Sequence, residues 1–292
     1  MQELIYYFTH LAIIIGIYAI LALGLNLVVG YTGLLSVMHA AFYGVGAYAT
    51  ALLMTQLGFN FFIATGLSVV IAIVLSFAIG LVLSRFDGDY YALGSLGFGV
   101  ILYSVFLSWR GVTRGALGIP QIPKPELFGF EFSQITVFLL LVVVLAAGVY
   151  LCSRFVTRSS FGRVLMAIRE DERAIQVFGY NTLYFKLTVF VIGAGIAAIA
   201  GALFASYITY INPSSFTAME SIYLLSIIIL GGLASLRGSV LGAVFLVVLF
   251  EGLRHIGLSS DMAAHMREAL YGVILVALML YRPQGLVGKY KL

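Results

Sequence analysis

Residues 61–84 read FFIATGLSVVIAIVLSFAIGLVLS and contain no charged side chain. A helix needs about 20 predominantly apolar residues to cross the hydrocarbon core of a bilayer. Runs of this kind recur along the chain at 4–29, 35–55, 61–84, 91–109, 134–153, 185–209, 220–236, 238–254 and 267–282. The pattern predicts an all-α polytopic membrane protein with about nine (eight to ten) transmembrane helices, in a single domain over residues 1–292.

The composition of the chain excludes a soluble globular protein. Hydrophobic residues make up 62% of the 292 positions and charged residues only 10%, whereas soluble domains carry roughly a quarter charged residues. So much apolar surface has to face lipid. The net charge of +4 reflects loop topology and does not indicate a nucleic-acid partner. Cys152 is the only cysteine, so neither an internal disulfide nor a cysteine metal cluster is possible.

The basic residues of the loops orient the chain. With nine spans, one side of the membrane receives eleven basic residues and the other side five. The richer side holds Arg85, Arg154, Arg158, Arg163, Arg169, Arg173, Lys186, Arg237, Arg282, Lys289 and Lys291, and the poorer side holds Arg110, Arg114, Lys124, Arg254 and Arg267. Because lysine and arginine collect in cytoplasmic loops, we expect the richer side and the C-terminus in the cytoplasm.

The stretch 24–46 interrupts the apolar pattern. Its glycines are Gly24, Gly30, Gly33, Gly44 and Gly46. Such a stretch is typical of a broken or re-entrant helix, which a membrane tolerates only against protein or a cavity. Polar Asn26, Ser36 and His39 flank the interruption. A lone polar side chain in a span either bonds a neighbouring helix or contacts a substrate, and the pattern leaves both roles open.

Two loops exceed a minimal connection. Residues 154–184 form the longest polar stretch, and within them apolar residues recur at helical spacing, with Gly179 as a stop signal. This loop is predicted to carry a cytoplasmic helix, which either lies solvated near anionic lipid or is presented to a cytosolic partner. Residues 110–133 hold three of the five prolines. They are predicted to form an extracytoplasmic loop where another partner docks.

Several motifs resemble one family. The loop sequence from Gly162 to Gly179 is similar to the coupling loop of branched-chain amino acid ABC permeases, although Arg173, Ala174 and Ile175 replace the family's Glu-Ala-Ala. Further similar stretches are GLNLVVGYTGLLS at 24–36, HAAFYGVGAY at 39–48, LGGLASLRGSVLGA at 230–243, where Ala234 replaces a glycine, and YRPQGL at 281–286. Their order and the chain length favour the M-type subunit over the H-type subunit.

The resemblance implies a role for particular residues. The expected ATPase-coupling residues are Arg163, Ile168, Arg169, Glu170, Asp171, Glu172, Arg173, Ala174 and Gly179. The expected translocation path includes Asn26, Gly30, Gly33, Ser36, His39, Tyr43, Gly44, Gly231 and Gly232. Independently of the resemblance, small residues such as Gly44 and Gly46 favour close helix packing.

The resemblance also implies partners and a location. The chain is expected in the bacterial inner membrane, paired with a second permease subunit, homologous or identical. Two cytosolic ATPases would bind ATP-Mg, and an extracytoplasmic binding protein would deliver leucine, isoleucine or valine. Relatives that carry urea, short amides or simple sugars remain alternatives.

No catalytic constellation or phosphate-binding loop is found, so the chain is predicted not to be an enzyme and to hold no cofactor. A stand-alone secondary transporter or channel is the rival from another class, and it predicts membrane-buried acids. Glu220 and Glu251 lie near predicted span ends, and Arg254 follows Glu251 at helical spacing. Interfacial snorkelling or pairing therefore explains both acids better than proton transport.

Overall fold

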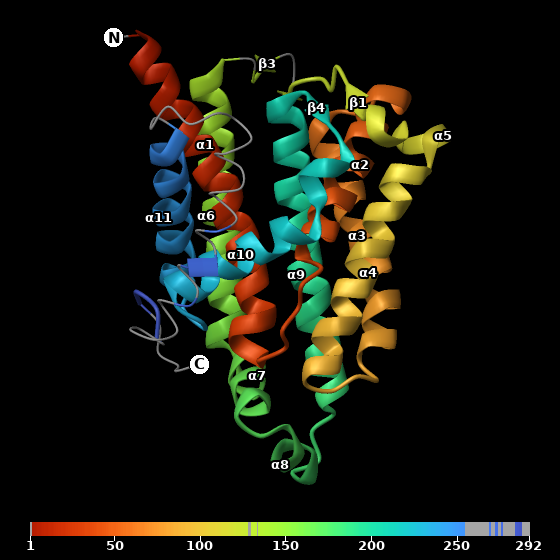
Figure 1. The fold of residues 1–292 in the computed structure, drawn as a ribbon, viewed down its shortest axis with the longest axis vertical. Coiled ribbons are helices and arrows are strands. Elements are labelled where there is room, and N and C mark those ends of the chain that lie inside the picture. The colour runs from red at the N-terminus through yellow and green to blue at the C-terminus, as the bar shows by residue number, and fades with distance from the viewer. Residues whose placement is uncertain are drawn as a thin grey trace.

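The structure is a computed structural model that describes residues 2–127, 130–132 and 134–254, with positions 269, 272, 273, 276 and 284–287. It is a helical bundle (Figure 1). In chain order the elements are α1 (Gln2–Leu25), the π-helix η1 (Asn26–Gly30), α2 (His39–Leu57), α3 (Phe61–Leu83), α4 (Asp89–Ser108), α5 (Arg110–Thr113), the 3-10 helix η2 (Gly115–Leu117), β1 (Ile119–Pro120), β2 (Glu126–Leu127), β3 (Phe130–Glu131), α6 (Ile135–Arg158), α7 (Ser160–Glu170), α8 (Glu172–Val177), α9 (Thr182–Ile208), β4 (Tyr210–Ile211), the 3-10 helix η3 (Pro213–Phe216), α10 (Ala218–Gly231) and α11 (Leu236–Arg254).

Five helical stretches in the described part of the chain are long and apolar enough to cross a membrane. They are Glu3–Gly30, Phe61–Leu83, Asp89–Ser108, Ile135–Arg158 and Thr182–Ile208. Each coincides with one of the predicted apolar runs, so these five predictions are confirmed. A continuous charge-free run long enough for the bilayer leaves the chain no alternative to a helix, because every backbone group has to be hydrogen-bonded within the segment.

The other predicted spans turn out differently. Residues 220–236 and 238–254 were expected to be two separate spans, but α10 and α11 meet at a bend of 118° and together pass for one broken span or a re-entrant loop. The run 35–55 forms α2, which is helical but is not among the sufficiently apolar helices. The run 267–282 lies outside the described residues. The described part thus contains five candidate spans, or six if the bent pair counts as one span.

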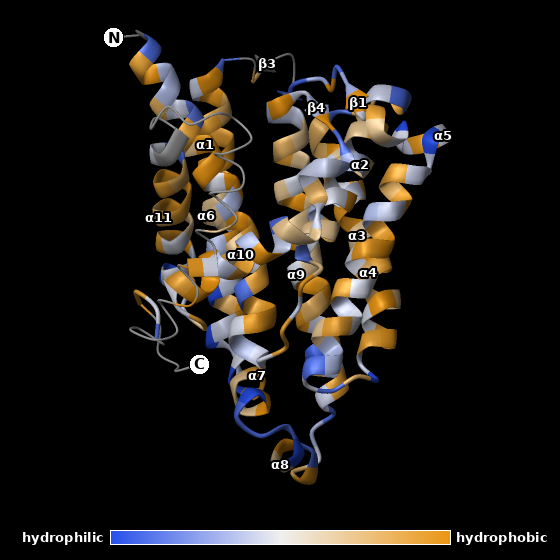
Figure 2. Cartoon of the chain, in the orientation of Figure 1, coloured by the Kyte–Doolittle hydropathy of each residue, from blue (hydrophilic) through white to orange (hydrophobic). Residues whose placement is uncertain are grey.

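The helices separate into a core and a periphery. The most apolar windows of α1 and α9 are 72% and 67% buried inside the bundle, whereas those of α3, α4 and α6 are 33%, 17% and 22% buried. The peripheral helices expose many large apolar side chains, and Figure 2 colours much of α3 and α4 as hydrophobic. Such surfaces are suited to lipid rather than water.

The helices α2 and α9 approach each other closely. A Cβ at Gly46 would overlap the backbone of Ala198, and a Cβ at Gly201 would overlap the backbone of Tyr43 and Ala47. Helices in lipid associate through packing, and small residues allow this close backbone approach. The packing role predicted for the small residues of α2 is therefore observed at Gly46.

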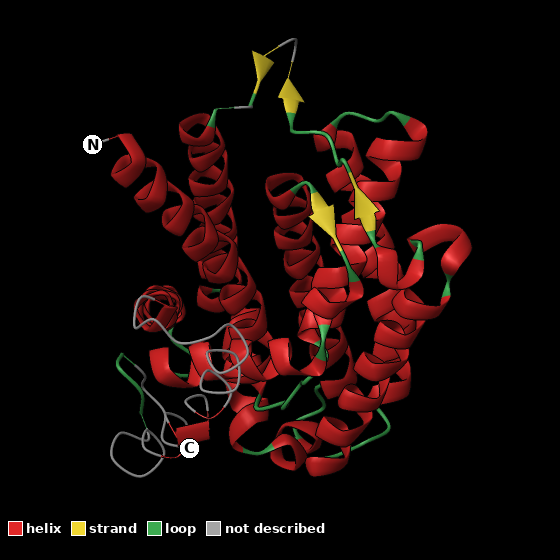
Figure 3. Ribbon diagram, turned by 45° about the horizontal axis from the view of Figure 1, so that its top comes forward, coloured by secondary structure: helices red, strands yellow, loops and turns green. Residues whose placement is uncertain are grey.

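The two long loops lie at opposite ends of the bundle (Figure 1). The segment between α4 and α6 contains α5, η2 and three short strands, and Figure 3 shows them at one end. β1 pairs with β4, and β2 pairs with β3, both antiparallel. The helices α7 and α8 extend from the other end.

Candidate functional site

The first break in the helices lies between α1 and α2, where the sequence predicted an interruption. The helix α1 continues into the π-turn η1, and residues 33–38 are not helical. Gly33 has a φ of +75°, a conformation that favours glycine. The non-helical segment is fixed to its neighbours because the Val37 N–H donates to Ser95 Oγ and the Ala40 N–H donates to Ser221 Oγ, both at 3.0 Å.

The second break lies between α10 and α11. Gly232 has a φ of +113° and Ala234 a φ of +56°, so two of its residues have left-handed backbone conformations. A Cβ at Gly231 would overlap the carbonyl of Gly238 across the bend. A residue near the C-terminus also contacts this break, because the Leu286 N–H donates to the carbonyl of Leu230 at 2.8 Å. The bend is therefore held by close backbone contacts.

Asn26 connects the two breaks. Its Nδ2 donates to the carbonyl of Ser235 at 3.1 Å and to Ser239 Oγ at 2.6 Å, and its Oδ1 accepts from the Ala234 N–H at 3.0 Å. The side chain is fully buried. Unmade hydrogen bonds in a buried setting are costly, so Asn26 stabilises the position of the second break relative to η1.

Arg169 joins this cluster from α7. Its Nη1 donates to the carbonyl of Gly30, the last residue of η1. Its side chain also lies against the turn that follows, because a Cβ at Gly33 would be 3.2 Å from Arg169 Cγ. Gly30 in turn touches Asn26, whose Oδ1 fills the space that a Cβ at Gly30 would need. A continuous line of contacts thus leads from α7 through η1 to the second break.

The helix α7 is anchored on the bundle. Ser159 caps its first turn by accepting the Gly162 N–H at 3.4 Å. Gly162, Leu165 and Ile168 are buried, and they recur at the spacing of one helix face. A Cβ at Gly162 would overlap the backbone of Thr157 at the end of α6. The helix therefore packs onto the bundle as a fixed element.

The helix α8 projects away from the bundle and has no buried residue. Asp171 separates it from α7 and caps it by accepting the Ala174 N–H at 3.0 Å. At its end, Val177 and Phe178 are 87% and 76% exposed. Gly179, with a φ of +86°, terminates the helix as the sequence predicted. The sequence predicted one helix across this loop, and the Asp171 cap divides it into two.

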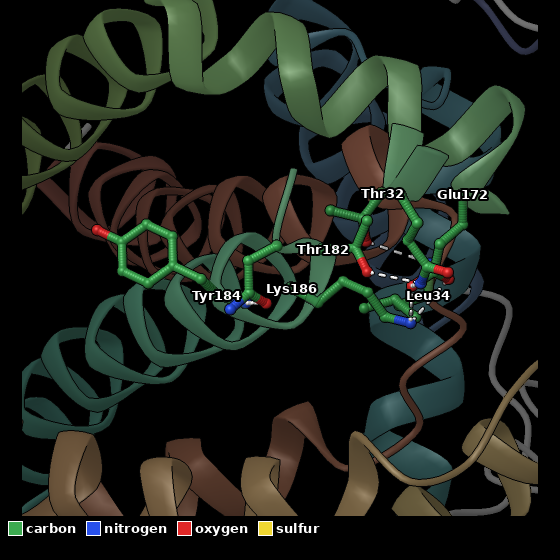
Figure 4. A network of polar contacts seen from close by, with 8 residues as sticks. Thr32, Leu34, Glu172, Thr182, Tyr184 and Lys186 are labelled. Atoms are coloured by element: carbon green, nitrogen blue, oxygen red, sulfur yellow. Dashed lines mark hydrogen bonds and ion pairs between the residues drawn. The ribbon is translucent and has the colours of Figure 1, made fainter. Parts of the chain in front are cut away.

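One ion pair attaches α8 to the membrane-spanning α9. Lys186 Nζ lies 2.9 Å from both carboxylate oxygens of Glu172. Gln176 Nε2 donates to Thr182 Oγ1 at 3.0 Å beside this pair. Figure 4 shows Glu172, Thr182 and Lys186 together. The Lys186 side chain is 8% exposed and that of Glu172 is 30% exposed. The lysine has less contact with water, so its charge relies more on the ion pair.

The predicted coupling residues occupy different environments. Ile168 is buried under α7, Arg169 bonds Gly30, and Glu172 pairs with Lys186. The exposed members of the predicted set are Arg163, Glu170, Asp171, Arg173 and Gly179, while Ala174 is half-buried. The exposed positions are the most accessible of the set to another protein.

The predicted path residues surround the two breaks. All except Gly33 are buried: Asn26, Gly30, Ser36, His39, Tyr43, Gly44, Gly231 and Gly232. Tyr43 packs against Phe204 and Phe216, with ring centroids 5.4 and 5.1 Å apart. His39 Nε2 is buried without a hydrogen-bond partner in the described part of the chain. These residues thus form the interior between the breaks.

The two acidic residues near span ends accept hydrogen bonds from tyrosines of α1. Tyr18 donates to Glu220 at 2.7 Å, and Tyr7 donates to Glu251 at 3.2 Å. The sequence predicted interfacial snorkelling or pairing for both acids, and each of them accepts a hydrogen bond from α1. The predicted pairing of Glu251 with Arg254 stays a prediction, because the Arg254 side chain lies outside the described residues. Sequence reasoning missed Lys186, Ser235 and Ser239 as members of the polar networks, and their only signal was polarity beside apolar runs.

These features define a polytopic membrane protein with broken helices and a protruding loop, and comparison with known proteins identifies its family. The family "Branched-chain amino acid transport system / permease component" matches residues 7–280. The chain is 38% identical to the high-affinity branched-chain amino acid transport system permease protein LivM of Salmonella typhimurium and 36% identical to that of Escherichia coli K12. Each alignment covers 93% of this chain and 68% of the relative.

The chain is also 25% identical to the permease protein LivH of Escherichia coli K12, over 93% of this chain and 91% of LivH. No solved structure is significantly similar to it. The chain therefore belongs to the family of branched-chain amino acid transport permeases, and it is a membrane transport component rather than an enzyme. The resemblance inferred from the motifs is confirmed.

Proposed function

We propose that this chain is the M-type membrane subunit of a binding-protein-dependent ABC importer for leucine, isoleucine and valine. The observation that carries the proposal is its similarity to LivM along 93% of its length. LivH, named as a permease of the same kind of system, aligns equally fully. A second permease subunit related to LivH is the proposed membrane partner, and the path lies between the two subunits.

The helix α8 is the proposed docking element for a cytosolic ATPase. Val177 and Phe178 are large apolar side chains exposed beyond the membrane-spanning helices. Exposed apolar patches rimmed by polar residues are typical of protein interfaces. Arg173 and Asp171 provide that rim and would fix the register of docking.

The helix α7 is the proposed transmitter. Because Leu165 and Ile168 are buried, a displacement of α8 by the ATPase moves α7 with the bundle. Arg169 then passes the movement to Gly30, and Asn26 passes it to the second break. Movements are transmitted between distant sites by packed elements that have two discrete arrangements. A helix break can change its arrangement while few backbone hydrogen bonds are broken.

The transport path is proposed to run beside the two breaks. The expected path residues lie there, and none of them is charged. Half-helix ends and irregular backbone bind neutral or zwitterionic groups in transporters. An amino acid with an apolar side chain fits this setting, and the Tyr43 cluster supplies apolar contact.

The basic loops orient this assembly. The α7–α8 end is proposed to face the cytoplasm, together with the C-terminus, because Arg158, Arg163 and Arg173 lie there. The strand-bearing loop 110–133 at the opposite end would receive the binding protein. The protein would then reside in the inner membrane of a bacterium.

The test is uptake of radiolabelled leucine by proteoliposomes that contain this chain, a LivH-type subunit, the ATPases and the binding protein. Uptake should require ATP and should be lost with the double variant Val177→Ser and Phe178→Ser. The double variant Leu93→Ser and Leu140→Ser alters exposed apolar residues of α4 and α6, and it should retain uptake as the matched control.

Uptake driven by a proton or sodium gradient without ATPases would contradict the importer. ATP-dependent uptake of urea or a simple sugar, without leucine uptake, would retain the architecture and overturn the substrate assignment.

A further inference from the structure

A cavity of about 760 Å³ opens where α6 ends and α11 begins. Arg154 and Arg158 reach it from the last turns of α6, and Arg237 reaches it from the first turn of α11. Its volume lies within the range of about 300–1,000 Å³ that is typical of ligand pockets. Three arginine residues thus line one cavity.

Within the residues that the structure describes, no ion pair joins any of these three arginines to a carboxylate. Within the described part of the chain, the ion pair observed joins Lys186 and Glu172 and involves none of them. Like charges around one cavity repel each other, and an anion between them removes the repulsion. The first turn of α11 adds to the positive potential, because its N–H groups carry the positive end of the helix dipole. The cavity is therefore suited to a negatively charged group.

Hydroxyl groups complete the polar end of the cavity. Tyr150 and Ser235 line it together with the arginines, and so does Thr157, whose hydroxyl donates to the carbonyl of Arg154. Hydroxyls donate hydrogen bonds to phosphate oxygens as well as to glycerol oxygens. This combination fits the phosphodiester and glycerol of a lipid headgroup.

A second, apolar cavity of about 620 Å³ continues from the first. The two share Tyr150 and Arg237. The other walls are apolar or glycine positions of membrane-spanning segments, from Ala12 to Leu23 on α1, from Val143 to Ala147 on α6, and Val240 with Leu241 on α11. The stretches of α1 and α6 belong to helices apolar enough to cross a membrane, so the cavity is suited to an acyl chain.

We propose that the two cavities form one binding site for an anionic phospholipid. The phosphate lies among Arg154, Arg158 and Arg237, and one acyl chain lies in the apolar cavity. Basic pockets between transmembrane helices are known recognition sites for anionic headgroups. A free phosphate would use the arginines alone, whereas a phospholipid would occupy both cavities, which share Tyr150 and Arg237 as lining residues. The site does not depend on which solute the protein transports.

The experiment is native mass spectrometry of the purified full chain in detergent, titrated with dioleoylphosphatidylglycerol, dioleoylphosphatidylcholine or sodium phosphate. Each substitution among Arg154→Gln, Arg158→Gln and Arg237→Gln should weaken phosphatidylglycerol binding about fivefold. The control Arg85→Gln removes an exposed arginine of the α3–α4 turn at the same end of the bundle, and it should leave binding unchanged. Size-exclusion chromatography identifies any variant that fails to fold.

A variant of the apolar cavity separates lipid from free phosphate. Ala147 lines that cavity, and Ala147→Trp should fill it and reduce phosphatidylglycerol binding while leaving the arginines intact. Equal binding of phosphatidylcholine would overturn the charge recognition. Undiminished phosphatidylglycerol binding in all three arginine variants would overturn the site. Displacement of the lipid by millimolar phosphate, with no effect of Ala147→Trp, would assign the cavity to a small anion instead.

Discussion

The helices α7 and α8 are neighbours in one loop, yet they have opposite environments. Leu165 and Ile168 of α7 are 0% and 4% exposed, whereas Val177 and Phe178 at the end of α8 are 87% and 76% exposed. A single residue, Asp171, separates the two helices. The helix α7 is therefore part of the bundle, whereas α8 is available to a partner.

The difference arises from the direction of the apolar faces. In α7 the apolar residues at helical spacing turn toward the ends of α6 and α9, where Gly162 allows close approach to Thr157. In α8 the Asp171 cap starts a new helix, so its apolar residues no longer continue the face of α7. The two halves should therefore respond differently to substitution.

The largest effect on stability is expected at the buried half. Leu165→Ala removes a fully buried side chain, and such substitutions lower the free energy of unfolding by about 2–5 kcal/mol. Val177→Ala on α8 should change it by less than about 0.5 kcal/mol, as is usual for surface sites. Titration with sodium dodecyl sulfate in mixed micelles measures both values. Equal destabilisation by the two substitutions would remove the distinction between α7 and α8.

An intermediate effect is expected for substitutions at the exposed end of α8, and it concerns the affinity for the ATPase rather than the stability of the fold. Phe178→Ala should weaken the affinity for the ATPase by about 2 kcal/mol, the size of an interface hot spot, because it truncates an exposed aromatic side chain. Calorimetric titration of the purified membrane subunits with the ATPase measures this change. The control Phe155→Ala removes a similarly exposed ring from α6. If both variants bind the ATPase like the native chain, α8 is not the docking element.

A smaller effect on stability is expected at the ion pair between Glu172 of α8 and Lys186 of α9, and it should differ between the two partners. Glu172→Ala leaves the nearly buried Lys186 without its partner, while Lys186→Met leaves Glu172 partly hydrated. Glu172→Ala should therefore be the more destabilising of the two, by about 1 kcal/mol. Thermal unfolding of the two variants gives the comparison. The reverse order would show that the carboxylate, not the ammonium group, is the dependent partner.

Most of the fold follows from local sequence, and the exceptions have physical reasons. The runs at 61–84 and 185–209 became α3 and α9 because an apolar stretch of that length can only be helical in lipid. The 118° bend between α10 and α11 was not predictable, because it rests on contacts between Gly231 and Gly238 and on the positive φ of Ala234. A hydropathy pattern contains no information on either of these features.

The site was predicted in outline, but the partners of its residues were not. Asn26 and Arg169 were recognised from motifs in segments far apart in the chain, and the structure brings them together through Gly30. Lys186 was counted only as a loop charge, although it pairs with Glu172 across the turn between α8 and α9. Such pairings depend on how helices pack, which a uniformly apolar pattern does not determine.

The most direct test of the coupling from α7 to the helix breaks is the amount of leucine taken up per ATP hydrolysed. Arg169→Ala removes the hydrogen bond to Gly30, and hydrogen bonds to charged groups contribute about 1.5–3 kcal/mol. The ratio should fall about tenfold or more while ATP hydrolysis continues. Arg85→Ala is the matched control, because Arg85 is an exposed arginine of the turn between α3 and α4 and is not among the expected coupling residues. An unchanged ratio in Arg169→Ala would contradict transmission through this contact.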